Sequence, residues 1–243
     1  MKFSRRTTIL AHYIFDQFVP PILRDNRWFM TFLFRLGLGE NSHYFINFKN
    51  KLGTISDEEL SDYYRASASS HIQRQTDLNR ACIDLIQEKV IEGETVLDIA
   101  CGSGYLANIL SIKSNVTAAD FVLNIDSTLD RGDIKWHEQR IESLDYPDSN
   151  FDTVVCAHTL EHTIDIQQAI AELRRVTKRQ LIVVVPKQRP YQYTPDLHTH
   201  FFYYKWQLEL LMKTRRANST SNIECELIGG DWVYIEEAEV ESY

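Results

Sequence analysis

A glycine-containing segment in the middle of the chain restricts the fold more than any other feature. Residues 96–107 read Val-Leu-Asp-Ile-Ala-Cys-Gly-Ser-Gly-Tyr-Leu-Ala, so an apolar run with Asp98 near its end is followed by Gly102, Gly104 and a helical pattern. Glycine permits a tight turn and a close approach of the backbone to a ligand, and Ala107 lets the helix pack near the strand. The segment therefore predicts a nucleotide-binding strand–turn–helix unit.

The carboxylate of Asp98 distinguishes between two kinds of nucleotide ligand. A negative charge beside the glycine turn repels the pyrophosphate of a dinucleotide such as NAD, whereas it attracts a ligand whose reactive end is positively charged. S-adenosylmethionine is such a ligand, because it carries a sulfonium and an ammonium group. The sequence thus favours S-adenosylmethionine as the cofactor over a nicotinamide dinucleotide.

Four further motifs follow the glycine turn along the chain. They are the apolar run 115–120 that ends in Asp120, the turn 144–152, the strand pattern 153–158 with the segment 160–165 after it, and the apolar run 181–185. In this order the motifs resemble those of the class I S-adenosylmethionine-dependent methyltransferases, from about Val90 to the C-terminus. The similarity implies methyl transfer from S-adenosylmethionine, with S-adenosylhomocysteine as the second product.

The resemblance implies an α/β fold. We expect a Rossmann-like, seven-stranded, mostly parallel sheet with an antiparallel terminal hairpin around Gly229 and Gly230, and helices on both faces. A helical N-terminal cap precedes the sheet. The chain is therefore divided into a helical extension at residues 1–80 and an S-adenosylmethionine-binding catalytic domain at residues 81–243.

Helical patterns mark most segments outside the expected strands. Apolar residues recur at helical spacing in residues 3–18, 28–38, 72–90 and 201–212. Ser56 is expected to cap a further helix, with Glu59 at the capping-box position. His162 is expected to begin the helix that follows the fourth strand.

The resemblance also assigns a cofactor site. Asp120, at a strand end, is suited to accept hydrogen bonds from both ribose hydroxyls. Where many family members use an Asp to hold the adenine, this chain has Arg140, which leaves that contact to its neighbours. The residues expected to bind the cofactor are Asp98, Ala100, Cys101, Gly102, Ser103, Gly104, Asp120, Phe121, Ile141, Glu142, Ala157 and His158.

Histidines near the expected position of the methyl group are candidates for a general base. Methyl transfer is an in-line displacement that depends on positioning, and a hydroxyl acceptor gains from a base with a pKa near neutrality. His162 is the leading candidate, followed by His198 and His200 in the loop rich in Pro and Tyr, where Asp196 can orient one ring. A cap or an ordinary hydrogen-bonded imidazole is the alternative for each. We expect no metal, since methyl transfer needs none.

Charge is distributed unevenly along the chain. Its net charge is −8, yet residues 1–51 contain eight basic and three acidic residues. The acidic remainder argues against nucleic-acid binding. The basic segment is expected to be a solvated helical cap, or else a surface for a peripheral membrane contact or a partner subunit, and a homo-oligomer stays open. The apolar stretch 28–38 is too short to span a bilayer.

Composition and the loop after the fifth strand lead to the function hypotheses. The four cysteines show no paired spacing, which favours reduced thiols and a cytoplasmic location. The loop ending in Asp196-Leu-His-Thr-His200 is similar to loops of polysaccharide-associated methyltransferases, so a hydroxyl of a sugar, nucleotide-sugar or glycan is the expected acceptor. The alternatives are a tRNA methyltransferase and a non-catalytic S-adenosylmethionine-binding partner subunit.

Overall fold

The computed structural model describes residues 13–14, 17–56, 58–63, 75–126, 128, 132–194, 196–213 and 220–238. These residues belong to two compact units, each of which is described by itself. The first unit lies within Met1–Arg74 and Arg189–Thr199, and the second within Gln75–Gln188 and His200–Tyr243. The segment after the fifth strand, 189–199, thus groups with the N-terminal residues. No helix of the described ranges is long and apolar enough to cross a membrane.

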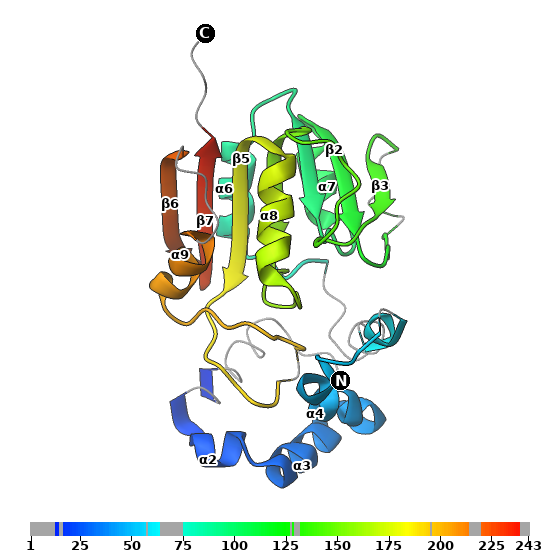
Figure 1. Ribbon diagram of the computed structural model, residues 1–243, viewed down its shortest axis with the longest axis vertical. Helices are drawn as coiled ribbons and strands as arrows, with labels where there is room; N and C mark the ends of the chain where they lie inside the picture. The colour runs from blue at the N-terminus through cyan, green and yellow to red at the C-terminus, as the bar shows by residue number, and fades with distance from the viewer. Residues whose placement is uncertain are drawn as a thin grey trace. The chain divides into compact units, whose positions relative to one another are not determined.

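The second unit is built on a seven-stranded sheet (Figure 1). Its strands are β1 (Thr95–Ile99), β2 (Asn115–Asp120), β3 (Lys135–Glu138), β4 (Phe151–Ala157), β5 (Thr177–Pro186), β6 (Thr220–Ile228) and β7 (Asp231–Ala238). The order is β3-β2-β1-β4-β5-β7-β6, with parallel pairing from β3 to β5 and antiparallel pairing of β7 with β5 and with β6. The expected mostly parallel sheet with a terminal hairpin is confirmed. The strand order reverses between β1 and β4, where such sheets bind ligands.

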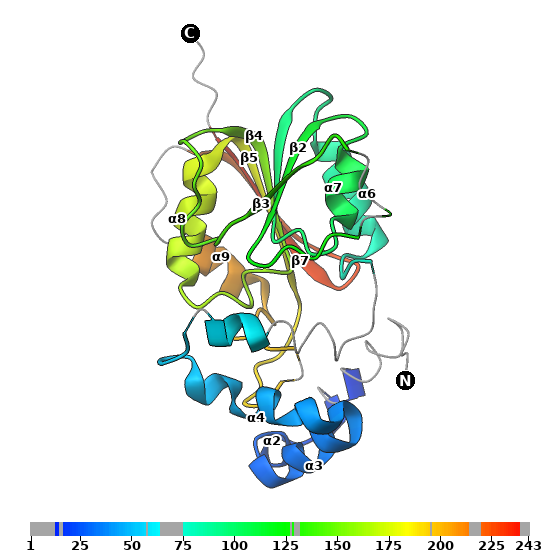
Figure 2. The ribbon, with the colours of Figure 1, turned by 90° about the vertical axis from the view of Figure 1, so that its right-hand side faces the viewer.

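Helices cover both faces of this sheet (Figure 2). Helices α6 (Arg80–Lys89) and α7 (Tyr105–Leu110) pack on one face, and α8 (Ile166–Val176) and α9 (Lys205–Lys213) on the other. Alternate residues of one strand therefore enter different cores, as Val96 joins the α6–α7 side while Leu97 joins the α8–α9 side. Burial on both faces explains why the central strands are continuously apolar.

Three helix boundaries differ from the sequence-based expectation. Helix α6 begins at Arg80 because the side chain of Asn79 accepts a hydrogen bond from the Cys82 N–H at 3.0 Å. His162 does not begin a helix but lies in the turn before α8. Helix α8 starts at Ile166, because the side chain of Asp165 caps it there. Helix α9 begins at residue 205, four residues later than expected.

The connection from α8 to β5 contains no loop. Thr177 is both the residue that caps the C-terminus of α8 and the first residue of β5, and its hydroxyl donates to the Leu173 carbonyl at 2.6 Å. The strand was expected only at 181–185, because residues 177–180 are polar or basic. Pairing with β4 and β7 extends it to Pro186 and back to Thr177.

The first unit contains short helices. They are α2 (Pro21–Arg24), α3 (Arg27–Leu38) and α4 (Ser42–Lys51), with a 3₁₀ turn at Gly39–Asn41 and a helical segment at 58–63. Helix α3 confirms the pattern at 28–38, and Ser56 caps the helical segment by accepting from the Glu59 N–H at 3.2 Å. Most of the expected helix at 3–18 lies outside the described residues.

Candidate functional site

The glycine turn lies at the carboxyl end of β1 and leads into α7. Ala100, Gly102 and Gly104 all have positive φ angles, of 59°, 55° and 82°. The N–H of Cys101 donates to the Ala119 carbonyl of β2 at 3.1 Å, and the N–H of Gly104 donates to the Cys101 carbonyl at 2.9 Å. A left-handed backbone costs a residue such as Ala100 energy, and such strain concentrates at ligand-binding sites. The turn is thus held in one defined conformation.

The two glycines of the turn meet different surroundings. Among the described residues, no atom other than those of the chain neighbours lies within 4 Å of the position that a Cβ would take at Gly102. At Gly104 a Cβ would lie 2.3 Å from Cη2 of Trp136, a residue of β3. The sequence analysis expected both glycines to make room for a ligand. Gly104 makes room for an indole of the protein itself, whereas Gly102 keeps its outer side open.

Asp98 places a buried carboxylate directly below the turn. Only 2% of the residue is exposed, and its Oδ2 has no hydrogen-bond partner among the described residues. Burial, together with the negative charge of Asp120, raises the pKa of Asp98 to about 7. A buried polar atom without a partner is uncommon in proteins. The atom therefore suits a ligand that supplies a positive charge or a hydrogen-bond donor.

Asp120 ends β2 beside the same turn. Its Oδ2 accepts a hydrogen bond from the Gly102 N–H at 2.8 Å, and its Oδ1 accepts from the Val122 N–H at 3.3 Å. Burial raises the pKa of Asp120 in spite of these hydrogen bonds. The two carboxylates make this edge of the sheet negative, which opposes a pyrophosphate and favours a cationic ligand.

His158 follows β4 and has a φ angle of 51°, which is unusual for a residue other than glycine. Its Nδ1 lies 3.5 Å from Oε1 of Glu161, and its Nε2 lies 3.4 Å from Oδ2 of Asp231. Burial alone would lower the pKa of His158, but the two carboxylates outweigh it and raise the pKa to about 10. The imidazole is therefore protonated at neutral pH, and it cannot accept a proton there.

Asp231 is a residue that the sequence analysis missed. It is the first residue of β7, and the side chain of Asn79 donates to its Oδ2 at 2.8 Å and to the Ile228 carbonyl at 3.0 Å. Because β7 is antiparallel to β5, it begins at the edge where the parallel strands end. No local sequence signal marks Asp231, since only the closure of the hairpin brings it beside His158.

The histidines proposed as bases occupy different surroundings. The N–H of His162 donates to the Thr159 carbonyl at 2.8 Å, which holds the turn before α8. The N–H of His200 donates to the Glu161 carbonyl, and its Nε2 lies 3.0 Å from the Thr163 carbonyl. Burial lowers the pKa of His200, so its ring is neutral. His200 therefore has the protonation state of a base, although one ring nitrogen already contacts the protein.

His198 belongs to the first unit. Its Nδ1 lies 3.4 Å from Oδ2 of Asp196, which is the pairing expected for a carboxylate that orients a ring. In the same unit the Lys49 ammonium donates a hydrogen bond to the Tyr191 carbonyl. Burial lowers the pKa of Lys49 to about 8, against the attraction of Asp196 and Asp25. The loop that carries His198 is thus attached to α4 within this unit.

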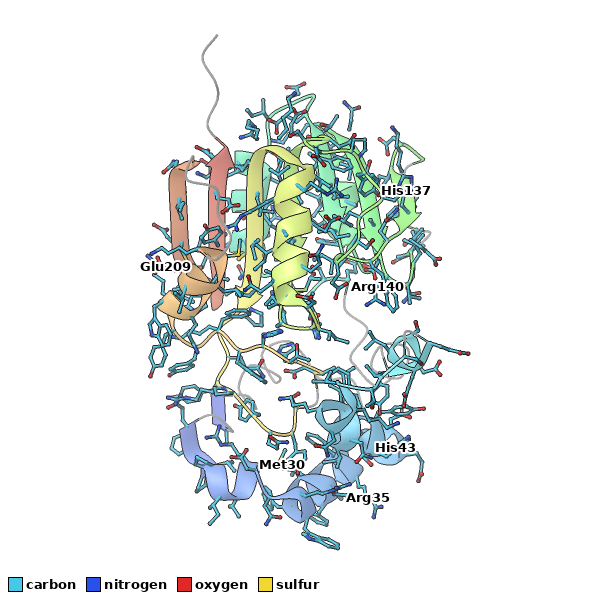
Figure 3. The ribbon with its side chains drawn as sticks, in the orientation of Figure 1. Met30, Arg35, His43, His137, Arg140 and Glu209 are labelled. Carbon is cyan, nitrogen blue, oxygen red and sulfur yellow. The ribbon has the colours of Figure 1, made fainter. Side chains whose placement is uncertain are left out.

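The segment expected near the adenine lies at the carboxyl end of β3 (Figure 3). The guanidinium carbon of Arg140 is 5.0 Å from the centre of the Phe121 ring, and its Nε is 3.8 Å from Oε2 of Glu142. The Ile141 side chain is buried in the core, so only its backbone is left for a ligand. Arg140 thus occupies the family's usual Asp position as a cation stacked on an aromatic ring.

The remaining residues of the expected set line the turn or adjoin it. The Ser103 hydroxyl donates to the Gln75 carbonyl at 2.6 Å, and Ala157 ends β4 next to His158. Burial raises the pKa of the Cys101 thiol, so this cysteine is not a reactive thiolate. All four cysteines lie in the described part of the chain, and no disulfide joins them.

Known proteins are similar to part of this chain. A family described as methyltransferase domain matches residues 97–185. The 2-phytyl-1,4-naphtoquinone methyltransferase of Nostoc sp. is 32% identical over 98 residues, which cover 35% of this chain and 43% of that protein. The ubiquinone biosynthesis O-methyltransferase of Paracidovorax citrulli is 33% identical over 97 residues, covering 36% and 41%. The chain thus spans about two fifths of the length of these curated relatives.

A solved structure shows a similar fold over a longer stretch. The Burkholderia thailandensis 1,6-didemethyltoxoflavin-N1-methyltransferase, determined with 1,6-didemethyltoxoflavin and S-adenosylhomocysteine, superposes with a TM-score of 0.60 at 15% identity. The match covers 76% of this chain and 91% of that protein. At this identity the comparison speaks for the fold alone.

Proposed function

Because residues 97–185 match a family described as methyltransferase domain, we propose that the protein is a class I S-adenosylmethionine-dependent methyltransferase, which transfers a methyl group from S-adenosylmethionine to a hydroxyl of a small molecule. The observation that carries the proposal is the buried Asp98 carboxylate, one oxygen of which has no hydrogen-bond partner among the described residues, together with Gly102, whose Cβ position meets no described atom. A cationic ligand compensates this charge, whereas a dinucleotide adds further negative charge.

The residues of the turn fit the parts of the cofactor. In this proposal Asp120, at the end of β2, accepts from the ribose hydroxyls, and the cofactor lies on the turn from Ala100 to Gly104. His158 and Ala157 form the wall beside the methionine part. When bound, S-adenosylmethionine supplies an electrophilic methyl group on a sulfonium, so the protein has to position the acceptor and exclude water.

A histidine assists the acceptor hydroxyl in this proposal. His158 is unsuited, because two carboxylates keep it protonated. His162 is our first candidate for the base, since it lies in the turn between the end of β4 and α8, at the ligand-binding edge of the sheet. His200 and His198 are the other candidates. A positioned base typically accelerates such a step about 10²- to 10⁴-fold.

Two acceptor classes follow from different observations. The first class is a sugar hydroxyl, the acceptor expected from the sequence. It is supported by the Pro- and Tyr-rich loop that contains His198 and His200. A hydroxyl of a quinone-related compound is the other class, because one relative is named an O-methyltransferase of ubiquinone biosynthesis and another a naphtoquinone methyltransferase. The similarity covers about a third of this chain, so it supports methyl transfer more strongly than the acceptor. The expected cytoplasmic location stays a prediction.

Calorimetry and a transfer assay test the proposal separately. We expect the protein to bind S-adenosylmethionine and S-adenosylhomocysteine and to show no binding of NAD. A labelled methyl group is then offered to sugar nucleotides, glycans and catechol-type phenols, and transfer to one of these acceptors is expected. Tight binding of NAD without binding of S-adenosylmethionine contradicts the donor assignment. Donor binding without transfer to any hydroxyl contradicts the acceptor class and favours a partner subunit.

A further inference from the structure

Helix α3 carries large apolar side chains on two opposite faces. Met30 and Phe34 are buried in the first unit, at 1% and 6% exposure. Trp28, Phe32 and Leu36 are 88%, 62% and 72% exposed. Their spacing of four residues places these three on one side of the helix. A surface helix normally presents polar residues on the face away from the core. The outer face of α3 is apolar instead, so exposure to water alone does not account for its residues.

The preceding helix and the residue ahead of it also carry exposed apolar side chains. Ile22 of α2 is 80% exposed, and Phe18 before it is 71% exposed. Only Asp25 and Asn26 separate α2 from α3, and the two helices follow each other directly in the fold (Figure 1). Single exposed apolar residues are ordinary, but a group of five on consecutive helices marks an interaction surface. We call Phe18, Ile22, Trp28, Phe32 and Leu36 the apolar ridge.

Positive charge accompanies the apolar ridge. Arg27 and Arg35 are exposed at the two ends of α3, and the sequence of α3 contains no acidic residue. Figure 3 labels Arg35 on this helix. Residues 1–51 carry a net charge of +5 within a chain whose net charge is −8. The exposed apolar side chains thus lie in a basic part of an acidic protein.

We propose that the apolar ridge is a docking surface for an anionic lipid bilayer. In this arrangement α3 lies parallel to the membrane plane, its exposed apolar side chains enter the region between headgroups and acyl chains, and Arg27 and Arg35 contact anionic headgroups. Trp28 suits the interface because an indole combines an apolar ring with a polar N–H. The twelve residues of α3 span about 18 Å, which is enough for three full turns of contact.

The charges on α3 favour an anionic bilayer over a second copy of the chain as the partner of the apolar ridge. In a two-fold interface the same patch faces itself, so Arg27 and Arg35 would approach the arginines of the other copy with no acidic residue of α3 between them. Headgroups such as phosphatidylglycerol instead supply the opposite charge. The proposal goes beyond the methyltransferase activity and does not depend on which acceptor is used.

Vesicle flotation with the full chain tests the lipid assignment. We expect the protein to float with vesicles of phosphatidylglycerol and phosphatidylcholine, to bind pure phosphatidylcholine at least tenfold more weakly, and to be released by salt. The double variant Phe32→Glu/Leu36→Glu is expected to lower binding to the mixed vesicles at least tenfold. The matched control is Ile112→Glu, which changes a 67% exposed side chain of the second unit and leaves vesicle binding unchanged.

A second variant and two further measurements complete the test. Arg27→Gln/Arg35→Gln is expected to weaken binding to the mixed vesicles several-fold and to reduce its salt dependence. Circular dichroism establishes that each variant is folded, and sedimentation gives the oligomeric state. The proposal is overturned if the wild type does not bind mixed vesicles, or if the Phe32/Leu36 variant binds as well as the wild type. A wild-type dimer that this variant dissociates assigns the ridge to a second copy instead.

Discussion

Nε2 of His158 lies 3.4 Å from Oδ2 of Asp231, and this ion pair joins the end of β4 to the start of β7. Glu161 contacts the other ring nitrogen, so one imidazolium is balanced by two carboxylates. His158 is thus held by the terminal hairpin as well as by its own turn. This arrangement allows a clear test of what the charge at His158 does.

His158→Leu is expected to destabilise the protein by about 3–5 kcal/mol, because it leaves two buried carboxylates facing an apolar side chain. The pKa of His158 is about 10 in the folded state, above the ordinary value of 6.5. Its contribution to stability is therefore complete below pH 6.5 and is lost as pH rises towards 10. Urea denaturation from pH 6 to 10 measures both effects.

The matched control for this prediction is the triple change His158→Leu/Asp231→Asn/Glu161→Gln. It removes the carboxylates together with the imidazolium, so part of the lost stability is expected to return. If His158→Leu keeps the wild-type dependence of stability on pH above 6.5, the ion pairs do not account for that dependence.

Asp98→Asn is expected to make the ligand-free protein more stable at pH 8. The pKa of Asp98 is raised from 3.8 to about 7, so the folded state holds the proton more tightly than the unfolded chain. Ionisation therefore removes stability as pH rises from about 4 to 7, and at pH 8 the substitution avoids that cost, which is on the order of 2–4 kcal/mol. Thermal unfolding at pH 5 and pH 8 measures the difference.

Asp152 provides the control of opposite sign for Asp98. Hydrogen bonds from Thr95 and an ion pair with Lys178 overcome partial burial and hold the pKa of Asp152 at about 2. Its contribution is present above pH 3.8 and is lost as pH falls towards 2, so Asp152→Asn is expected to lower stability at pH 8. Equal effects of the two substitutions would contradict the assignment for Asp98.

Binding of S-adenosylmethionine is expected to strengthen as pH rises through 7. A cationic ligand favours the ionised form of Asp98, so each pH unit below 7 weakens binding by up to about tenfold. Asp98→Asn is expected to weaken binding at pH 8 by two orders of magnitude or more, and to remove the dependence on pH. Calorimetry at pH 5.5, 6.5 and 7.5 follows this change. Binding independent of pH in the wild type would separate Asp98 from the cationic end of the ligand.

Asp120→Ala is expected to weaken cofactor binding about 10- to 100-fold, since hydrogen bonds to a charged group contribute about 1.5–3 kcal/mol each. The substitution also removes the acceptor for the Gly102 N–H, so the unfolding temperature is measured in parallel. Asp84→Ala is the control, because Asp84 is an exposed residue of α6 whose carboxylate pairs with Arg80. Equal affinities for the two variants would exclude Asp120 from the ribose site.

Gly104→Ala is expected to destabilise the protein more than Gly93→Ala. The two glycines have φ angles of 82° and 83°, so the cost of a left-handed backbone is the same. Only Gly104 faces an obstacle, because a Cβ there lies 2.3 Å from Trp136. The steric conflict is expected to add about 1–3 kcal/mol. Adding Trp136→Leu to Gly104→Ala is expected to return part of this loss, and equal urea midpoints for the two glycine variants would contradict the contact.

The sequence was sufficient for the sheet and for the glycine turn after its first strand, because continuous apolar runs and the glycine turn are local signals. The positions of Asp98 and Asp120 at strand ends were predictable for the same reason, whereas their role towards a ligand stays a prediction. The partner of His158 was not predictable, because Asp231 reaches it only through antiparallel pairing of β7 with β5. The roles of the two glycines were not separable either, since Trp136 comes from a four-residue strand with a weak pattern.

The direct passage from α8 into β5 limits how this part of the molecule can change. Side chains of a strand alternate between its faces, so one residue inserted after Val176 would turn Leu181, Val183 and Val185 away from the core that they fill. Because no loop separates α8 from β5, an extra residue would have to enlarge the register irregularity already present opposite Phe151 and Thr153 of β4, or shift β5 against both neighbours. We therefore expect insertions at this junction to destabilise the protein. Folded variants are expected to keep the same number of residues between α8 and β5.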